Sequence, residues 1–237
     1  MKDDVKHSRR YDSTRRQEVA EETSRLIMSA ARQLFLERGY LSTTMPTIAK
    51  QAGVAVDTIY ASCGRKPEIL RALIERAISG EDVPVAALQR AYVREMQAEP
   101  DARRKLIRYA RATTEIQARL APLVRVLKEA APTDPALAGL WATISQRRAS
   151  NMRLLVADLE TTGRLREDVT RDEAADVIWA TNSPEFFMLM VEERGWSPDR
   201  FEHWLVQSWI RLLLTDNANS SHISVHQKMG SEVDTPG

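Results

Sequence analysis

The sequence predicts an all-α protein with an N-terminal helix-turn-helix, three-helix domain followed by a larger C-terminal helical domain. Glycine is scarce, with 9 among 237 residues, and no stretch alternates apolar and polar residues for long. Apolar residues recur instead at intervals of three and four, which is typical of helices with one buried face. Residues 47–70, "TIAKQAGVAVDTIYASCGRKPEIL", contain two helical patterns that are each too short to be stable alone.

The first long helix is predicted in "SRLIMSAARQLFLERGY", and Gly39 fits the left-handed residue that ends it. It begins either at Thr14, where "TRRQ" matches a capping box, or near Thr23. Residues 1–13 are then expected to form a flexible charged arm. That arm is either a soluble tail or a segment that reaches the DNA minor groove or nearby phosphates.

Three shorter helices are predicted to follow within residues 14–80. Thr44 is a suitable N-cap for the first of them, and Gly53 ends it. The second begins at about Val56. Pro67 opens the third, which Gly80 ends and which would link the two domains.

Residues 81–215 are predicted to form the second domain. The helical segments expected there are 85–98, 101–119, 121–131, 135–162, 171–194 and 198–214. Thr170 and Glu173 match a capping box, and "NSP" at 182–184 should kink or divide its segment because proline removes a helical hydrogen bond. Residues 216–237 contain little to bury and are expected to be disordered.

A short helix, a turn with glycine and a second short helix describe a helix-turn-helix. Ala49, Val54 and Ile59 are spaced to meet between the two helices. The second helix would then lie exposed, and a single α-helix fits the major groove of double-stranded DNA. The residues left on or beyond its outer face are Val56, Asp57, Thr58, Tyr60 and Lys66.

The stretch "AARQLFLERGYLSTTMPTIAKQAGVAVDTIYASCGRKPEIL" resembles the DNA-binding domain of TetR/AcrR-family transcriptional regulators, over about residues 24–74. The resemblance implies that Thr44 is a capping phosphate contact and that Val56, Asp57 and Thr58 form the base-reading edge. It also implies that Tyr60 and Lys66 hold the DNA backbone, and that residues 81–215 form a ligand-binding and dimerisation domain.

Cys63 departs from the resemblance, because TetR-type proteins usually carry an aromatic residue three positions after the tyrosine. The smaller side chain should loosen the packing between the third and fourth helices. Two interpretations stay open, a small buried apolar residue and a redox-sensing thiol.

Composition argues against several other classes of protein. Residues 1–80 contain 14 Lys/Arg and 10 Asp/Glu, whereas the remaining residues contain 20 Lys/Arg and 23 Asp/Glu. The N-terminal part of the chain is therefore net basic, which suits a polyanionic partner. The single cysteine excludes an intrachain disulfide, and neither a secretory signal nor an apolar run long enough to span a membrane is present. We therefore expect a cytoplasmic protein without a membrane association.

Catalytic and metal-binding motifs are not found in the sequence. It lacks a glycine-rich phosphate loop, a Gly-x-Ser-x-Gly motif and paired carboxylates in an apolar frame. The four histidines, His7, His203, His222 and His226, are too scattered for a metal site. We expect no enzyme activity, no cofactor and no metal.

Aromatic and thioether side chains gather in the predicted second domain, where they could line a small-molecule pocket or form the core. Those in the middle of central helices are the candidates for the pocket: Tyr109, Trp141, Met152, Trp179 and Phe187. The last two helical segments carry apolar stripes that look too wide for one interface. The candidates for a homodimer interface are Phe186, Met190, Phe201, Trp204, Leu205, Trp209 and Leu212.

The sequence thus predicts a homodimeric transcriptional regulator, a repressor that binds a palindromic DNA operator and responds to a small-molecule effector. Two alternatives stay open. The protein could be a DNA-binding repressor without an effector, or a small-molecule-binding helical protein in which the helix-turn-helix is incidental.

Overall fold

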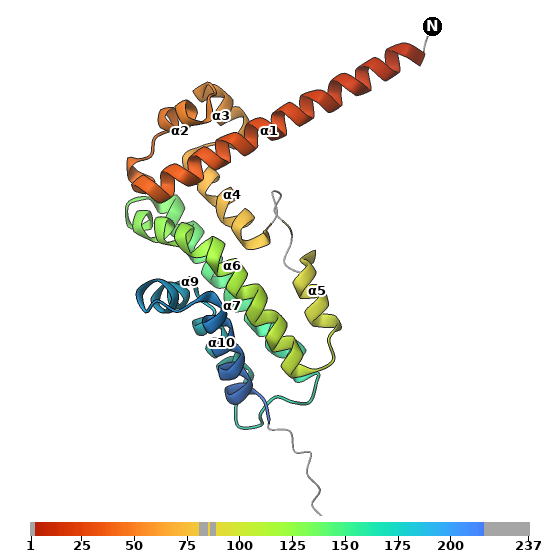
Figure 1. The fold of residues 1–237 in the computed structure, drawn as a ribbon, viewed down its shortest axis with the longest axis vertical. Helices are drawn as coiled ribbons and strands as arrows, with labels where there is room; N and C mark the ends of the chain where they lie inside the picture. The colour runs from red at the N-terminus through yellow and green to blue at the C-terminus, as the bar shows by residue number, and fades with distance from the viewer. Residues whose placement is uncertain (1–2, 81–84, 86–88, 216–237) are drawn as a thin grey trace, which may run out of the picture.

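The computed structural model describes residues 3–80, 85 and 89–215, with side chains omitted for residues 3–14 and 16. Helices make up nearly all of this part of the chain, which confirms the all-α prediction (Figure 1). The only β-type pairing within it is an isolated bridge between Leu165 and Leu214. The predicted disordered tail, residues 216–237, lies outside the described residues.

The first four helices form the N-terminal domain. Their bounds are α1 Asp3–Ser42, α2 Met45–Ala52, α3 Val56–Cys63 and α4 Lys66–Ser79. In Figure 1, α2 and α3 lie on the side of α1 that faces away from the later helices, and α4 lies between α1 and α6. The predicted flexible arm differs, because α1 already begins at Asp3. Residues 3–38 contain neither glycine nor proline, so nothing in the sequence ends the helix there.

Local capping explains where α2 and α4 begin and end. The Thr44 hydroxyl accepts the Thr47 N–H at 3.3 Å, and Gly53 takes the left-handed conformation after α2, both as predicted. The Arg65 N–H donates to the Glu68 carboxylate at 2.7 Å at the start of α4. A side chain at Gly64 would collide with that carboxylate, and its φ of +78° is also one that favours glycine.

The second domain contains the remaining helices. Their bounds are α5 Ala91–Ala98, α6 Ala102–Ala130, η2 Ala131–Thr133, α7 Pro135–Glu160, α8 Arg171–Thr181, α9 Pro184–Phe187, η3 Met188–Glu193 and α10 Pro198–Leu213. The predicted break at residue 120 is wrong, because α6 continues through Pro122. Residues around it, Leu120, Ala121, Leu123 and Val124, are buried. Their packing outweighs the roughly 3 kcal/mol that an internal proline costs.

The division at "NSP" is confirmed, since α8 ends at Thr181 and Ser183 caps α9 by accepting the Phe186 N–H at 3.0 Å. The chain then continues as a π-helical segment, η3, which the sequence did not predict. Ser197 caps α10 and Pro198 occupies its first position, as predicted.

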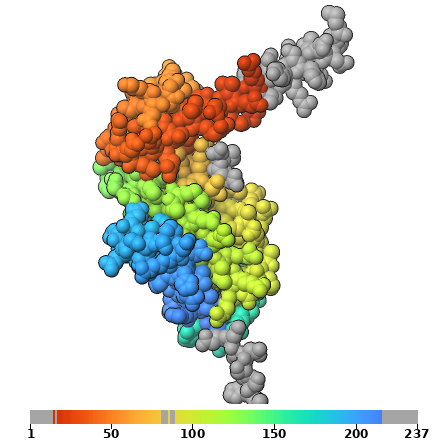
Figure 2. Space-filling view, viewed as in Figure 1, coloured from red at the N-terminus to blue at the C-terminus, as the bar shows by residue number. Residues whose placement is uncertain are grey.

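Two clusters of buried apolar residues form the core. One joins α1–α4 with the C-terminal half of α6 and the start of α7, and the other fills the space among α5–α10. Leu123 and Leu127 of α6 belong to the first cluster, whereas Leu106 and Ala110 of the same helix belong to the second. The predicted domain boundary near residue 80 is therefore crossed by a continuous core, and the two lobes in Figure 2 lie in direct contact.

A buried ion pair fixes α6 to α5 and α7. The Lys105 side chain is 3% exposed, and its ammonium lies 2.7 Å from the Asp158 carboxylate. It also donates to the carbonyls of Met96 at 2.9 Å and Gln97 at 3.3 Å. Because a buried charge is stabilised only by its partners, this pair holds three helices together.

We expect Asp158→Ala to lower the free energy of unfolding by about 3 kcal/mol, because it leaves the Lys105 ammonium buried without its carboxylate. Urea denaturation at one fixed protein concentration measures this change. Asp172→Ala is the matched control, since Asp172 forms an exposed pair with Arg153 at 3.4 Å, and it should leave the midpoint nearly unchanged. Equal midpoints for both variants would contradict a stabilising role of the buried pair.

Candidate DNA-binding surface and ligand cavity

The helix-turn-helix is built around the apolar wedge predicted from the sequence. Ala49 and Ile59 are buried, and Val54 packs against the same cluster while its N–H donates to the Ala49 carbonyl at 3.1 Å. This packing fixes α3 across α2, so the side of α3 opposite Ile59 faces outward.

Of the DNA contacts predicted on α3, Asp57 and Tyr60 lie on its outward side, whereas Val56 packs against the N-terminal core. Asp57 is exposed, Tyr60 is 49% exposed, and Val56 and Thr58 are half-buried. Thr44 is also exposed, at the N-terminus of α2, with its hydroxyl engaged as the cap. The structure therefore places Thr44, Asp57 and Tyr60 where a duplex could reach them.

Lys66 has a structural role that the sequence did not predict. Its ammonium donates to the carbonyls of Tyr40 and Thr43, both at 2.9 Å, and lies 4.1 Å from the Tyr40 ring centroid. Burial lowers the pKa of Lys66, and the charge of Asp134 opposes that shift. Burial raises the pKa of Tyr40, and the Asp134 carboxylate raises it further. Lys66 thus ties the end of α1 to the start of α4, beside a carboxylate of the second domain.

Cys63 packs at the edge of the N-terminal core. Its side chain is half-buried, and its sulfur lies 3.7 Å from the Ser24 hydroxyl. This environment fits the interpretation as a small packed residue, and the redox interpretation stays untested.

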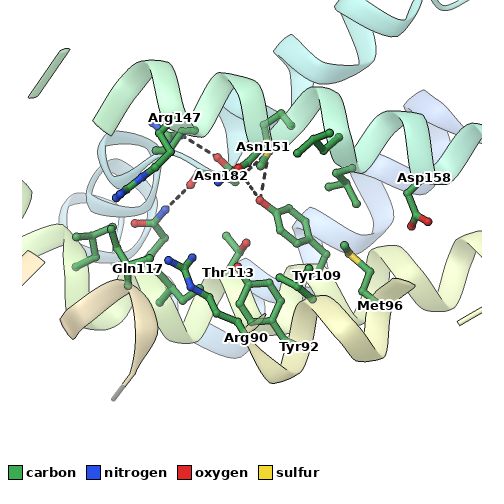
Figure 3. A pocket seen from close by; sticks show the side chains of 18 of the residues that line it. Arg90, Tyr92, Met96, Tyr109, Thr113, Gln117, Arg147, Asn151, Asp158 and Asn182 are labelled. Carbon is green, nitrogen blue, oxygen red and sulfur yellow. Dashed lines mark hydrogen bonds between the residues drawn. The ribbon is translucent and has the colours of Figure 1, made fainter. Parts of the chain in front are cut away.

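A cavity of about 130 Å³ lies in the second domain, bounded chiefly by α5, α6 and α7 (Figure 3). Its apolar wall includes Ile78 of α4, Val93 and Met96 of α5, and Ile116 of α6. Several polar side chains also line it, namely Arg90, Tyr109, Thr113, Gln117, Arg147, Arg148, Asn151, Asp158 and Asn182. Apolar walls with a few placed polar groups are typical of small-molecule sites.

Asn182 organises the polar part of the cavity. Its amide donates to the Tyr109 hydroxyl at 2.7 Å and to the Met152 sulfur at 3.1 Å. Its side-chain oxygen accepts from Arg148 at 2.8 Å, and its main-chain carbonyl accepts from the Gln117 amide. Burial raises the pKa of Tyr109 well above its usual range, so its hydroxyl stays protonated and donates to the Met152 sulfur at 3.2 Å.

Two of the five predicted pocket residues line this cavity, Tyr109 and Met152. The other three do not. Trp141 packs against the N-terminal core with the Lys128 ammonium 5.0 Å from its ring centroid, and Phe187 stacks edge-on against Phe201. Trp179 packs against the second core, beneath the Arg148 guanidinium at 5.2 Å.

Sequence reasoning missed the polar residues of the cavity. Arg147 and Arg148 both line the cavity, although neither was among the pocket residues predicted from the sequence. Asn182 belongs to the "NSP" break, which was interpreted only as a helix divider. Gln117 carried no signal beyond its position on a helix.

The predicted dimer interface divides into two sets. Phe201, Leu205 and Trp209 are fully buried within the protomer, so including them in an interface between subunits was wrong. Phe186, Met190 and Trp204 are half-buried, Leu212 of α10 is 50% exposed, and Leu189 of η3 is 44% exposed. The sequence of a wide apolar stripe does not indicate which of its edges packs into the core of the same chain. In α10 the edge with Phe201, Leu205 and Trp209 is buried in the protomer, and Leu212 stays exposed.

Within the described residues, no group of His, Cys, Asp and Glu is arranged to hold a metal ion. His203 is exposed on α10, whereas His222 and His226 lie outside the described residues. None of the helices in this part of the chain has the length and apolar character needed to cross a bilayer.

Comparison with known proteins bears on both domains. Residues 27–73 match the sequence profile described as "Bacterial regulatory proteins, tetR family". The sequence has no significant match among curated proteins. Three solved structures with a similar fold illustrate the structural likeness.

A transcriptional regulator from Saccharomonospora viridis, crystallised with choline, is 22% identical, with 82% of this chain and 99% of that chain covered and a TM-score of 0.62. NalD of Pseudomonas aeruginosa, the secondary repressor of the MexAB-OprM multidrug efflux pump, is 21% identical, with 83% and 98% covered and a TM-score of 0.62. The fatty acid degradation regulator FadR of Bacillus halodurans is 19% identical, with 79% and 94% covered and a TM-score of 0.62.

These structures share the fold across both domains, and the profile match covers α2, α3 and most of α4 together with the end of α1. Residues 27–73 thus match the helix-turn-helix region of tetR-family bacterial regulatory proteins, and the rest of the chain shares the fold of the solved structures above.

Proposed function

We propose that this protein is a ligand-responsive transcriptional repressor that binds a palindromic DNA operator as a homodimer. The observation that carries the proposal is that one apolar core packs against both α3, the exposed recognition helix, and the walls of the cavity. A cavity beside the linking helix favours this function over a repressor without an effector.

The recognition helix supports the DNA-binding part of the proposal. Asp57 and Tyr60 project from a helix whose other side is locked in the wedge, so α3 can enter a major groove without unfolding the domain. A phenol hydroxyl at the groove edge suits a phosphate oxygen, and such contacts set the register of the protein on DNA.

The connection from cavity to α4 supports the regulatory part. Arg147 lines the cavity and its guanidinium lies 2.8 Å from the Glu75 carboxylate on α4. Arg119 of α6 donates to the Ala77 carbonyl at 3.1 Å, and Ile78 itself lines the cavity. A ligand that binds better when α4 is displaced would shift the two recognition helices of a dimer. Choline in the S. viridis protein illustrates that a protein of this fold binds a small molecule.

Pairing between copies of the chain is supported by the apolar surface left on η3 and α10. Leu189, Trp204 and Leu212 remain partly exposed after the protomer core has formed. A two-fold pair buries this surface twice and presents two recognition helices to half-sites about one DNA turn, or a multiple, apart.

Selection of binding sites from random duplex DNA with the full-length protein tests the function. We expect an enriched palindrome, and Tyr60→Phe should weaken binding about fivefold without changing the selected sequence, because it removes one phosphate hydrogen bond. Lys66→Ala should weaken binding and also lower the urea midpoint, because Lys66 holds α1 to α4. If no sequence is enriched by folded protein, the repressor proposal falls.

Leu212→Glu should raise the dimer dissociation constant by roughly 30-fold, which corresponds to about 2 kcal/mol at an interface hot spot. Sedimentation equilibrium over a range of protein concentrations measures it. Ile107→Glu is the control, since Ile107 of α6 is 44% exposed and lies outside the proposed interface. Equal dissociation constants for both variants would contradict the proposed interface. A parent protein that stays monomeric at every concentration would contradict the dimer itself.

Glu75→Gln should lower operator affinity by about two- to fivefold in the absence of ligand, because it removes the charge that holds Arg147 to α4. The pair is partly exposed, so its loss corresponds to no more than about 1 kcal/mol. Fluorescence anisotropy of labelled operator measures the change, with Arg153→Gln as a control on the same helix as Arg147. Equal affinities for the two variants would show that this ion pair does not connect cavity and α4.

A further inference from the structure

We propose that the cavity binds a small organic anion, with an apolar body and a hydrogen-bond donor near its charged group. This inference rests on the proposed function for its regulatory meaning, but the binding itself can be measured without DNA. The cavity's charge, the half-buried Arg148 and the buried amide oxygen of Gln117 carry it.

Positive charge is concentrated at one end of the cavity. In Figure 3, Arg90, Arg147 and Gln117 lie at one end, whereas Met96 and Asp158 lie at the other. Among these, Arg147 has a carboxylate partner, Glu75. The cavity end is thus cationic, and an anion entering it gains attraction in a partly dehydrated space.

Arg148 provides the strongest part of this field. Burial lowers the pKa of its guanidinium, which nevertheless stays charged near neutral pH. It donates to two neutral acceptors, the Trp179 carbonyl and the Asn182 side-chain oxygen, both at 2.8 Å through the same nitrogen. Within the described residues it forms no salt bridge, although the charge of Glu185, which pairs with Lys128 at 2.7 Å, favours its charged form. A half-buried cation gains from a direct anionic partner, and a ligand anion would supply one.

Gln117 favours a ligand that carries a hydrogen-bond donor. Gln117 is 4% exposed and lines the cavity, yet its Oε1 has no hydrogen-bond partner among the described residues. The amide cannot be reversed, because its nitrogen faces the Asn182 carbonyl, which only accepts. A ligand hydroxyl or N–H would satisfy this buried oxygen, and leaving such an oxygen unpaired is costly.

The opposite end of the cavity does not favour a cation. Asp158 is the carboxylate that lines it, and the Lys105 ammonium already neutralises that carboxylate at 2.7 Å. Tyr109 and Thr113 lie between the two ends (Figure 3). A volume of about 130 Å³ is similar to the roughly 150 Å³ of an engineered cavity that holds benzene, so the body of the ligand is the size of one ring or a short chain.

Matched pairs of acid and primary amide test the proposal with the full-length protein. The probes are benzoate and benzamide, 3-hydroxybenzoate and 3-hydroxybenzamide, and hexanoate and hexanamide, with 3-hydroxybenzylamine as the cation. Isothermal titration calorimetry at low salt measures the dissociation constants. We expect at least one acid to bind about 10- to 100-fold more tightly than its amide, as a hydrogen bond to a charged group implies, and the amine to bind most weakly.

Variants assign the binding to the named residues. Arg148→Gln should abolish the preference for the acid, whereas Arg148→Lys, which keeps the charge and guards against a folding defect, should retain part of it. Arg153→Gln on the same helix is the matched control and should change nothing. Gln117→Met should remove the preference for 3-hydroxybenzoate over benzoate.

The outcomes separate this inference from the proposed function. Amides or the amine binding as tightly as the acids, no acid binding at all, or an acid preference that survives Arg148→Gln would each overturn the anion site. If an acid bound through Arg148 without changing the affinity for the operator, the anion site would be supported and its regulatory role would be contradicted. If only neutral compounds released the operator, the repressor function would be supported and the anion proposal would be overturned.

Discussion

The arrangement of both domains depends on the packing of one helix, α6, into two cores. Its first half is buried with α5, α7 and α10, and its second half is buried with α1 and α4. Because a closely packed helix moves as a unit, neither core can shift without the other responding. The tolerance of Pro122 in the middle of α6 has the same origin, since burial on both sides of the proline compensates for the lost hydrogen bond.

The polar groups inside the second domain follow a different constraint. Buried polar atoms must be paired, and Asn182 satisfies the Tyr109 hydroxyl, one nitrogen of Arg148 and the Gln117 amide together. This network fixes the side chains in place before a ligand enters, which lowers the entropy cost of binding. Within the described residues, it leaves the Gln117 oxygen without a partner and Arg148 without a salt bridge, and these two groups would determine which ligands gain by entering.

Features that depend on neighbours in sequence could be predicted, and those that depend on tertiary packing could not. Thr44, Gly53 and Ser197 act as caps because their geometry is set within four residues. The apolar stripe of α10 was visible as well, but Trp209 and Leu212 differ only in which side the protomer covers, and periodicity carries no information on that. The burial of Lys105 and the polar lining of the cavity come from helices far apart in sequence, so single residues gave no sign of them.

The charge of the cavity and the attachment of α4 involve the same side chain. Arg147 lines the cationic end of the cavity while its guanidinium contacts Glu75 on α4. An anion bound beside Arg148 would also attract Arg147, and an attraction toward the cavity weakens the hold on Glu75. A neutral ligand of equal shape lacks this effect, because it can act on α4 only by displacing Ile78. In this arrangement, the feature that selects the ligand is also the one that would transmit its presence to the recognition helix.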